Sequence, residues 1–171
     1  TLTDFMLAKE NSIRAAVDAM IDSGLPLGPQ EAVDSIFAIY KEKGIEHQRV
    51  FNFFLEKTIG RVDDRILAAA VVAYRRARGG SLVPYPHAHF VLNRLQKKGY
   101  KLAVVSDAPG FEAWQRLNYI GLQHIFDTVL TFDDTGHHKP DPKPFIMALE
   151  LMKVEAARTV LIGDWIERDI L

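Results

Sequence analysis

The sequence predicts an α/β protein that has a doubly wound parallel sheet and an inserted segment of four helices. Three observations lead to this fold class. Residues 3–80 carry apolar side chains at helical spacing and show no strand pattern. After a proline-containing stretch at 81–86, short apolar runs alternate with helical patterns. Strands that alternate with helices of this length predict parallel crossover connections.

Four amphipathic helices are expected within residues 3–80. Apolar side chains recur at helical spacing in each of them, and a glycine follows each stretch and stops the helix. The expected helices cover residues 3–23, 30–43, 46–57 and 63–78. Phe51 and Phe54 repeat at helical spacing in the third helix, and such aromatic stripes favour a core position over a ligand pocket.

Helices and strands alternate beyond the stretch at 81–86, which is expected to be a hinge because it holds two prolines. The apolar runs at 102–105 and 160–162 are short, as is typical of buried parallel strands. A third strand is expected at 128–131. Helical patterns fill the intervals between these strands, so we expect all three to lie parallel in one sheet.

Composition and charge limit the possible classes of function. The chain has 171 residues and is expected to form one domain, or one core with an insertion. A net charge of -1 gives no electrostatic reason to expect nucleic acid or an anionic membrane as a partner. The sequence holds no cysteine, which excludes disulfides and thiolate catalysis. No apolar run reaches the roughly 18 residues of a membrane span, and we expect a cytoplasmic protein, either monomer or homodimer.

Two carboxylates follow the apolar run at 160–162. Gly163 lets the backbone turn sharply, so Asp164 is expected at the carboxyl end of a strand, where open α/β sheets bind ligands. Asp169 follows in the next turn and can face the same crevice. Two carboxylates about 4 Å apart repel by roughly 4 kcal/mol at an effective dielectric constant of 20, so they need a cation or a shared proton. Oxygen ligands suit Mg2+; the alternative is an ordinary turn in which Asp164 caps a helix and Asp169 is solvated.

Two further stretches place polar groups at the same sheet edge. Ser106 follows its strand directly, and Asp107 opens the turn into the next helix, whose exposed amides favour an anion. A hydroxyl and backbone amides at this position suit a phosphoryl oxygen, although Ser106 taken alone would be interpreted as a turn residue. Lys139 lies in a segment of alternating prolines, so its ammonium is expected at a fixed point where it neutralises a phosphate and nearby carboxylates.

These motifs, in this order and spacing, resemble those of the haloacid dehalogenase-like (HAD) hydrolase superfamily. Ser106 at a strand end resembles its second motif, and the Lys-Pro-Asp-Pro-x-x-Phe segment at 139–145 resembles its third. Gly163 and Asp164, followed by Asp169, resemble its fourth. The resemblance covers essentially the whole chain and indicates subfamily I, which has a helical C1 cap and contains phosphoglycolate phosphatase-like enzymes.

The resemblance implies a Rossmann-like hydrolase core at 81–171 that also includes Thr1 and Leu2, and an inserted four-helix cap at 3–80. The chain departs from the family because the first motif, Asp-x-Asp-x-Thr, is missing from it. In the family the first Asp of that motif is the nucleophile and the second is the general acid and base. Thr1 and Leu2 match its tail. We therefore expect a fragment cut at both ends, with an apolar strand and an Asp-x-Asp pair just before Thr1 in the intact protein.

By this resemblance the intact protein is expected to be a magnesium-dependent phosphatase that hydrolyses a small phosphorylated metabolite through an aspartyl-phosphate intermediate. Ser106 and Lys139 would hold the transferring phosphoryl group, with help from the amide of Asp107. Asp164 would bind Mg2+, and Asp169 would support the metal or order Lys139. The chain as printed would be inactive, since it lacks the nucleophile.

Two alternative functions stay open. The printed chain without a nucleophile is also compatible with a catalytically silent protein that binds a phosphoester or serves as a scaffold. A 2-haloacid dehalogenase of the same superfamily is disfavoured, because such an enzyme needs no magnesium and the pair of Asp164 and Asp169 is intact.

Overall fold

The chain folds into two compact units. The computed structural model describes residues 1–169. A helical unit comprises Phe5–Leu82, and an α/β unit comprises Thr1–Asp4 together with the chain from Val83 onward. The chain leaves the α/β unit after Asp4 and returns to it after Leu82, so the helical unit is an insertion. Within residues 1–169 no helix is long and apolar enough to cross a membrane.

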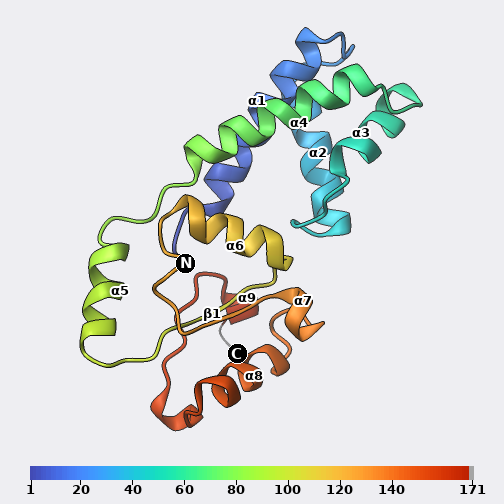
Figure 1. Ribbon diagram of the computed structural model, residues 1–171. Coiled ribbons are helices and arrows are strands. Elements are labelled where there is room, and N and C mark those ends of the chain that lie inside the picture. Colours follow the sequence, from blue (N-terminus) through green and yellow to red (C-terminus); the bar gives the residue numbers. More distant parts are fainter. Residues whose placement is uncertain (170–171) are drawn as a thin grey trace. The chain divides into compact units, whose positions relative to one another are not determined.

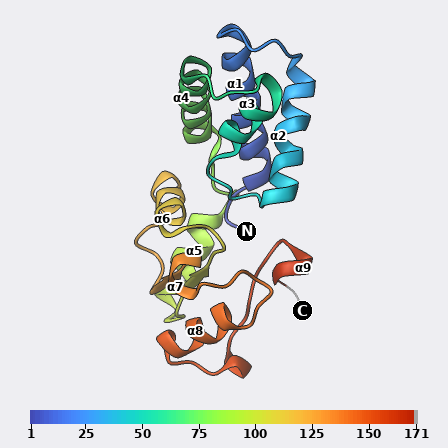
Figure 2. The ribbon, with the colours of Figure 1, turned by 90° about the vertical axis from the view of Figure 1, so that its right-hand side faces the viewer.

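The helical unit contains four helices joined by short loops (Figure 1). They are α1 (Phe5–Asp22), α2 (Pro29–Lys43), α3 (Val50–Ile59) and α4 (Asp64–Ser81). α1 and α4 make the most extensive contact and lie side by side in both ribbon views (Figures 1 and 2). Local signals fix the helix ends, because the Asp63 side chain caps α4 and Gly60 closes α3 in the left-handed conformation.

Two predicted helix boundaries in this unit are wrong. The third helix begins at Val50, because a turn in which the His47 amide donates to the Gly44 carbonyl (3.1 Å) precedes it. The fourth helix does not stop at Gly79 and continues to Ser81, where the Leu82 amide donates to the Arg78 carbonyl (3.1 Å). Glycine is a weak helix former, but it does not end a helix whose backbone hydrogen bonds continue.

The core of the helical unit is apolar and receives side chains from all four helices. Its fully buried members include Ile13, Val17, Met20, Ile36, Phe54, Leu55 and Ala70. Each fully buried Val, Leu, Ile, Met or Phe side chain contributes roughly 1.5–3 kcal/mol of hydrophobic free energy relative to the exposed state. Phe51 and Phe54 are among the buried residues, so the aromatic stripe of α3 is part of the core, as the sequence predicts.

Lys9 is a charged residue buried in the same unit. Its side chain is 7% exposed, and its Nζ donates to the Ile45 carbonyl (3.0 Å). The ammonium lies 4.1 Å from the centroid of the Tyr40 ring, and the rings of Phe5 and Tyr74 lie within 5.9 Å. Cation–π attraction and the carbonyl together compensate the loss of hydration.

The α/β unit alternates helices and strands, as the sequence predicts. Its elements are α5 (Ala88–Lys97), β1 (Ala103–Val105), α6 (Gly110–Tyr119), β2 (Thr128–Leu130), α7 (Phe132–Thr135), α8 (Lys143–Met152), a 3-10 turn (Ala156–Arg158) and α9 (Ile166–Asp169). β1 and β2 pair in parallel with Val104 opposite Val129. The helix α6 connects them, and α8 packs against both strands (Figure 1). This α/β arrangement with a parallel sheet and inserted helices agrees with the predicted fold class.

The two strands are fixed at both ends. At their amino ends the Asp127 carboxylate accepts a hydrogen bond from the Leu102 amide (2.8 Å). At their carboxyl ends the Ser106 amide donates to the Leu130 carbonyl (2.8 Å). Parallel strands end at the same edge of a sheet, so the loops after β1 and β2 leave the sheet side by side.

The strand predicted at 160–162 is not formed in residues 1–169, so this prediction is wrong. Val160, Leu161 and Ile162 are 83%, 52% and 73% exposed, and this segment pairs with neither β1 nor β2. The segment, β1 and α8 line an apolar groove of about 620 Å³. A strand requires a neighbouring strand for its hydrogen bonds, and among residues 1–169 none lies beside this segment.

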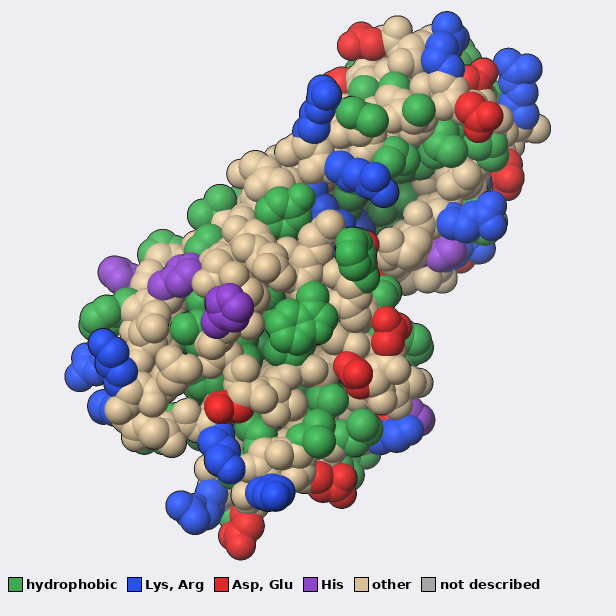
Figure 3. All heavy atoms as spheres, viewed as in Figure 1, with side chains coloured by type: hydrophobic (Ala, Val, Ile, Leu, Met, Phe, Trp, Pro, Cys, Tyr) green, Lys and Arg blue, Asp and Glu red, His purple; other side chains and the backbone are tan. Residues whose placement is uncertain are grey.

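Charged side chains of both signs are intermixed on the face shown in Figure 3. Blue and red side chains alternate over both units without a large area of one sign. This distribution agrees with the net charge of -1.

Candidate active site

The loop after β1 places Ser106 at the carboxyl end of the sheet. The Ser106 Oγ accepts a hydrogen bond from the Ala108 amide (3.2 Å), so the side chain helps to form the turn that leads into α6. Ser106 is half-buried and directly follows the last residue of β1, which is the position that the sequence predicts; its contact with a phosphoryl oxygen stays a prediction. The turn role and a ligand role are compatible, since a hydroxyl can accept one hydrogen bond and donate another.

The loop after β2 supports the beginning of α6. Asp133 accepts a hydrogen bond from the Gly110 amide (2.8 Å), and a Cβ placed on Gly110 would lie 3.1 Å from the same carboxylate oxygen. The Thr131 hydroxyl and amide both donate to Asp134 (2.6 and 2.8 Å) and form a capping box for α7. These contacts hold the two strand-end loops against each other.

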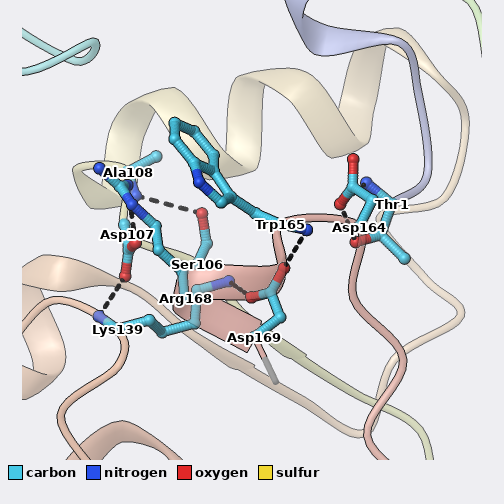
Figure 4. A network of polar contacts seen from close by, with 9 residues as sticks. All are labelled: Thr1, Ser106, Asp107, Ala108, Lys139, Asp164, Trp165, Arg168 and Asp169. Carbon is cyan, nitrogen blue, oxygen red and sulfur yellow. Dashed lines mark hydrogen bonds and ion pairs between the residues drawn. The ribbon is translucent and has the colours of Figure 1, made fainter. Parts of the chain in front are cut away.

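Lys139 is fixed at its backbone and at its ammonium. Its amide donates to Asp107 Oδ1 (2.9 Å), and its Nζ donates to Asp169 Oδ1 (2.6 Å), as Figure 4 shows. The side chains of Lys139 and Asp169 are 16% and 6% exposed. A short, largely buried ion pair of this kind orients an ammonium while two of its three N–H donors can serve another anion.

Both oxygens of Asp169 accept hydrogen bonds. Besides the ammonium of Lys139, the Trp165 amide donates to Asp169 Oδ2 (3.1 Å). Burial raises the pKa of Asp169, but the hydrogen bonds from Lys139 and Trp165 outweigh it and hold this pKa below its usual value. Asp169 is therefore a carboxylate at neutral pH.

Gly163 makes the position of Asp169 possible. A Cβ on Gly163 would lie 2.2 Å from the Cβ of Asp169 and 2.5 Å from its Oδ2. No side chain fits at such distances. The glycine of the Gly-Asp motif thus permits the close approach that the sequence predicts, although here it approaches a carboxylate of the chain itself.

Asp164 lies next to Gly163 and is exposed. Its side chain is 62% exposed, and its Oδ1 accepts a hydrogen bond from the Thr1 hydroxyl (2.8 Å) (Figure 4). Asp164 and Asp169 are near enough for each charge to affect the other, as two carboxylates in one crevice should be.

Asp164 fits the chemistry of a magnesium ligand better than Asp169 does. Within residues 1–169 no three His, Asp or Glu side chains form a metal-binding cluster. Protein sites for Mg2+ commonly use one or two carboxylates and leave other positions to water and substrate phosphate, so the exposed Asp164 suits one such position. Asp169, with both oxygens engaged, suits the role of ordering Lys139. The assignment of both residues as ligands stays a prediction.

The structure also brings in residues whose role was not predicted. Arg168 donates to Asp107 Oδ2 (3.2 Å), and its guanidinium lies 4.2 Å from the centroid of the Trp165 ring. The sequence predicts a role only for the backbone amide of Asp107. No motif links position 107 to positions 165 and 168. The one sequence feature that could have indicated the contact is the opposite charge of Asp107 and Arg168.

The histidines before Lys139 lie outside this network. His137 Nδ1 lies 2.9 Å from Asp141 Oδ2, and His138 stacks on Phe132 with ring centroids 4.2 Å apart. The amide of Lys143 is the main cause that lowers the pKa of Asp141, and His137 adds to it. These contacts stiffen the segment that carries Lys139 and do not form a metal site.

Comparison with known proteins agrees with the motifs. A family model described as haloacid dehalogenase-like hydrolase matches residues 32–171. The glyceraldehyde 3-phosphate phosphatase of Methanothermobacter thermautotrophicus is 34% identical over 158 residues, which cover 92% of this chain and 70% of that protein. The phosphoglycolate phosphatase of Psychrobacter arcticus is 36% identical over 99 residues, covering 58% of this chain and 43% of that protein.

The fold has close counterparts among solved structures. A HAD phosphatase from Thermococcus onnurineus superposes with a TM-score of 0.69 and 23% identity, covering 99% of this chain and 75% of that one. The fold and the matching family model together define a class of hydrolases that have a Rossmann-like α/β core and a helical insertion. The chain belongs to the haloacid dehalogenase-like hydrolase family, which confirms the family predicted from its sequence.

Proposed function

We propose that the intact protein is a magnesium-dependent phosphatase that acts on a small phosphomonoester. The observation that carries this proposal is the ammonium of Lys139, held by Asp169, in a segment whose backbone is bonded to Asp107 directly after Ser106 and β1. A fixed cation, a hydroxyl and backbone amides at one sheet edge suit the three charged oxygens of a phosphoryl group. The names of two relatives, which are phosphatases, support the same reaction class.

Each residue of the site has a distinct role in this proposal. Lys139 neutralises charge on the phosphoryl group, and the Ser106 hydroxyl and the Asp107 amide hold its oxygens. Asp169 keeps Lys139 oriented. Asp164 would hold Mg2+, which when bound offsets charge on the phosphoryl oxygens. The helical unit would act as a cap that excludes water and selects the substrate.

The nucleophile is proposed to lie ahead of Thr1. The first aspartate of the Asp-x-Asp pair would attack phosphorus, and the second would give its proton to the ester oxygen as that oxygen leaves. The second aspartate would then take a proton from the water that hydrolyses the aspartyl phosphate. The groove between β1 and residues 160–162 supports the proposal, because it is apolar, borders Thr1 and Leu2, and has the strand β1 along one side. An apolar strand in that groove would bring its carboxyl end toward Lys139 and Asp169, which also line it.

The substrate is proposed to be a small phosphorylated metabolite. The two relatives named above suggest glyceraldehyde 3-phosphate and phosphoglycolate as the first compounds to assay. Both place a phosphate on a chain of two or three carbons. Fold alone does not choose between them, because one fold hosts many substrates.

The decisive experiment is a phosphatase assay on the intact protein with p-nitrophenyl phosphate, with and without Mg2+. Turnover that requires the metal supports the proposal. Equal turnover without metal contradicts the magnesium dependence. A protein that lacks turnover but is stabilised against heat by phosphate would instead be the silent phosphoester-binding protein. The sequence encoded ahead of Thr1 gives a separate check, since the absence of an Asp-x-Asp pair there would exclude the aspartyl-phosphate mechanism.

A further inference from the structure

The side chain of Asp107 joins three segments that the proposed function needs in one place. The first is the turn after β1 that holds Asp107 itself. The second is the Lys139 segment, whose amide donates to Asp107 Oδ1 (2.9 Å). The third is the segment that ends with α9, from which Arg168 donates to Oδ2 (3.2 Å). Asp107 is only 12% exposed, so both contacts are shielded from water.

The contacts around Asp107 close into a ring, which Figure 4 shows from close by. From Asp107 the ring passes to the backbone of Lys139, then along that side chain to Asp169 (2.6 Å). Asp169 accepts from the amide of Trp165 (3.1 Å), and the Trp165 ring lies 4.2 Å from the guanidinium of Arg168. Arg168 in turn donates a hydrogen bond to Asp107, which closes the ring. A closed ring fixes each member from two sides, which an isolated ion pair does not do.

Charge also favours a positioning role for this ring. It contains two carboxylates and two cations, so its net charge is zero. Arg168 balances Asp107, which leaves the ammonium of Lys139 paired with one carboxylate only. Without Arg168, the carboxylate of Asp107 would lie unbalanced beside the Lys139 backbone and would weaken the attraction of that cation for an anionic substrate.

We infer that Asp107 and Arg168 are positioning residues of the phosphoryl-transfer site, which set where the ammonium of Lys139 lies. This inference rests on the proposed function. It assigns the side chain of Asp107 a second role besides that of its amide, and it gives Arg168 and Trp165 a role that no motif indicates. Neither side chain needs to touch the substrate.

The test measures kcat and KM of the intact protein with p-nitrophenyl phosphate and Mg2+ for Asp107→Ala, Asp107→Asn, Arg168→Met and the double variant of Asp107→Ala with Arg168→Met. A misplaced ammonium is expected to lower kcat by about 10-fold to 100-fold, with a much smaller change in KM. The double variant is expected to lose no more than Asp107→Ala alone, because the two residues act as a unit. Arg168→Lys keeps the charge and is expected to recover part of the lost kcat.

Asp127→Asn is the matched control. Asp127 also accepts a backbone hydrogen bond, but from Leu102 at the opposite end of the strands. We expect this control to lower the melting temperature about as much as Asp107→Asn does while kcat stays unchanged. Values of kcat for Asp107→Ala and Arg168→Met within about twofold of the unaltered protein would overturn the inference, as would an equal loss of kcat in Asp127→Asn.

Failure of the proposed function can be told apart from failure of this inference. If the unaltered intact protein has no turnover, the proposed function is wrong, and inorganic phosphate then serves as the probe. A rise in melting temperature with phosphate that disappears in Asp107→Ala supports the positioning role. The role is overturned if phosphate stabilises Asp107→Ala equally, or if it does not stabilise the unaltered protein.

Discussion

The helical unit has a large apolar core, whereas the α/β unit leaves one apolar segment exposed and buries an ion pair in its candidate site. In the helical unit the residues of the apolar core come from helices that follow one another in sequence, such as Ile13, Ile36 and Phe54. The α/β unit also buries apolar side chains, such as Leu122 and Leu130, but its apolar segment 160–162 is exposed. The ion pair of Lys139 and Asp169 in this unit is largely buried. The apolar core therefore stabilises the helical unit, whereas the α/β unit holds the polar groups of the candidate site.

The difference separates the residues needed for stability from those needed for activity. A core built from neighbouring helices closes by local contacts. The candidate site joins segments that are far apart in sequence, here 106–107, 139 and 163–169. Substitutions in the two units should therefore affect different measurements, and four predictions test this.

Phe54→Ala is expected to have the largest effect. Phe54 is 1% exposed in the core of the helical unit, and its truncation should lower the free energy of unfolding by about 3–5 kcal/mol. Urea unfolding of the intact protein measures this loss. Phe111→Ala, at a side chain that is 74% exposed, is the control and should change stability by no more than about 0.5 kcal/mol. Equal losses in both variants would contradict the assigned core.

Lys139→Met is expected to have the second largest effect, and this effect is on activity. Removing the fixed ammonium is expected to lower kcat by about 10²-fold to 10³-fold, which corresponds to about 2.7–4 kcal/mol. The measurement is turnover of p-nitrophenyl phosphate well below the melting temperature, so that any loss of stability does not enter. Lys97→Met, on α5, is the control with the same change in charge. A kcat within a factor of two of the unaltered value would remove Lys139 from the site.

Adding one methyl group should have opposite effects in the two units. Gly163→Ala places a Cβ 2.2 Å from that of Asp169, and overpacking of this kind should cost about 1–3 kcal/mol and lower kcat. Gly80→Ala adds the same group inside α4, where nothing lies within 4 Å, and should stabilise the protein by about 0.5–1 kcal/mol. Melting temperatures of the two variants give the comparison, and a shift of the same sign in both would refute it.

The smallest effect depends on pH and concerns Tyr40. Burial, with the nearby Tyr74 and Glu46, raises the pKa of Tyr40 above its ordinary value of 10.0. Because the folded pKa is the higher one, the associated stability is complete below pH 10.0 and declines as the pH rises further, by about 1.4 kcal/mol per unit. Tyr40→Phe should flatten this alkaline decline in thermal unfolding curves, whereas Tyr100→Phe, at an exposed ring, should leave it unchanged.

Much of the fold could be predicted from the sequence because its signals are local. Helical periodicity placed all four helices of the inserted unit, and the order of apolar runs placed β1 and β2. The start of α3 was predicted too early, because periodicity does not reveal the turn between Gly44 and His47. The strand predicted at 160–162 failed for a different reason, since an apolar pattern forms a strand only beside a hydrogen-bonding partner.

The candidate site was predictable only as far as its motifs reach. Ser106, Lys139 and Asp169 follow motif spacing, and the structure brings Lys139 and Asp169 into direct contact. The carboxylate of Asp107 and the guanidinium of Arg168 meet from positions sixty-one residues apart, and no periodicity encodes that pairing. Such contacts arise from the way strand ends converge, which only a folded structure reveals.

The burial of Lys9 has a practical consequence for experiments on the two units. An ammonium covered by aromatic rings cannot reach an amine-acylating reagent while its surroundings stay closed. The rate at which this lysine is acylated, measured by mass spectrometry, would therefore report the rate at which the helical unit opens. Exposed lysines elsewhere in the same molecule would react without such a delay, and their rate of acylation serves as the internal reference.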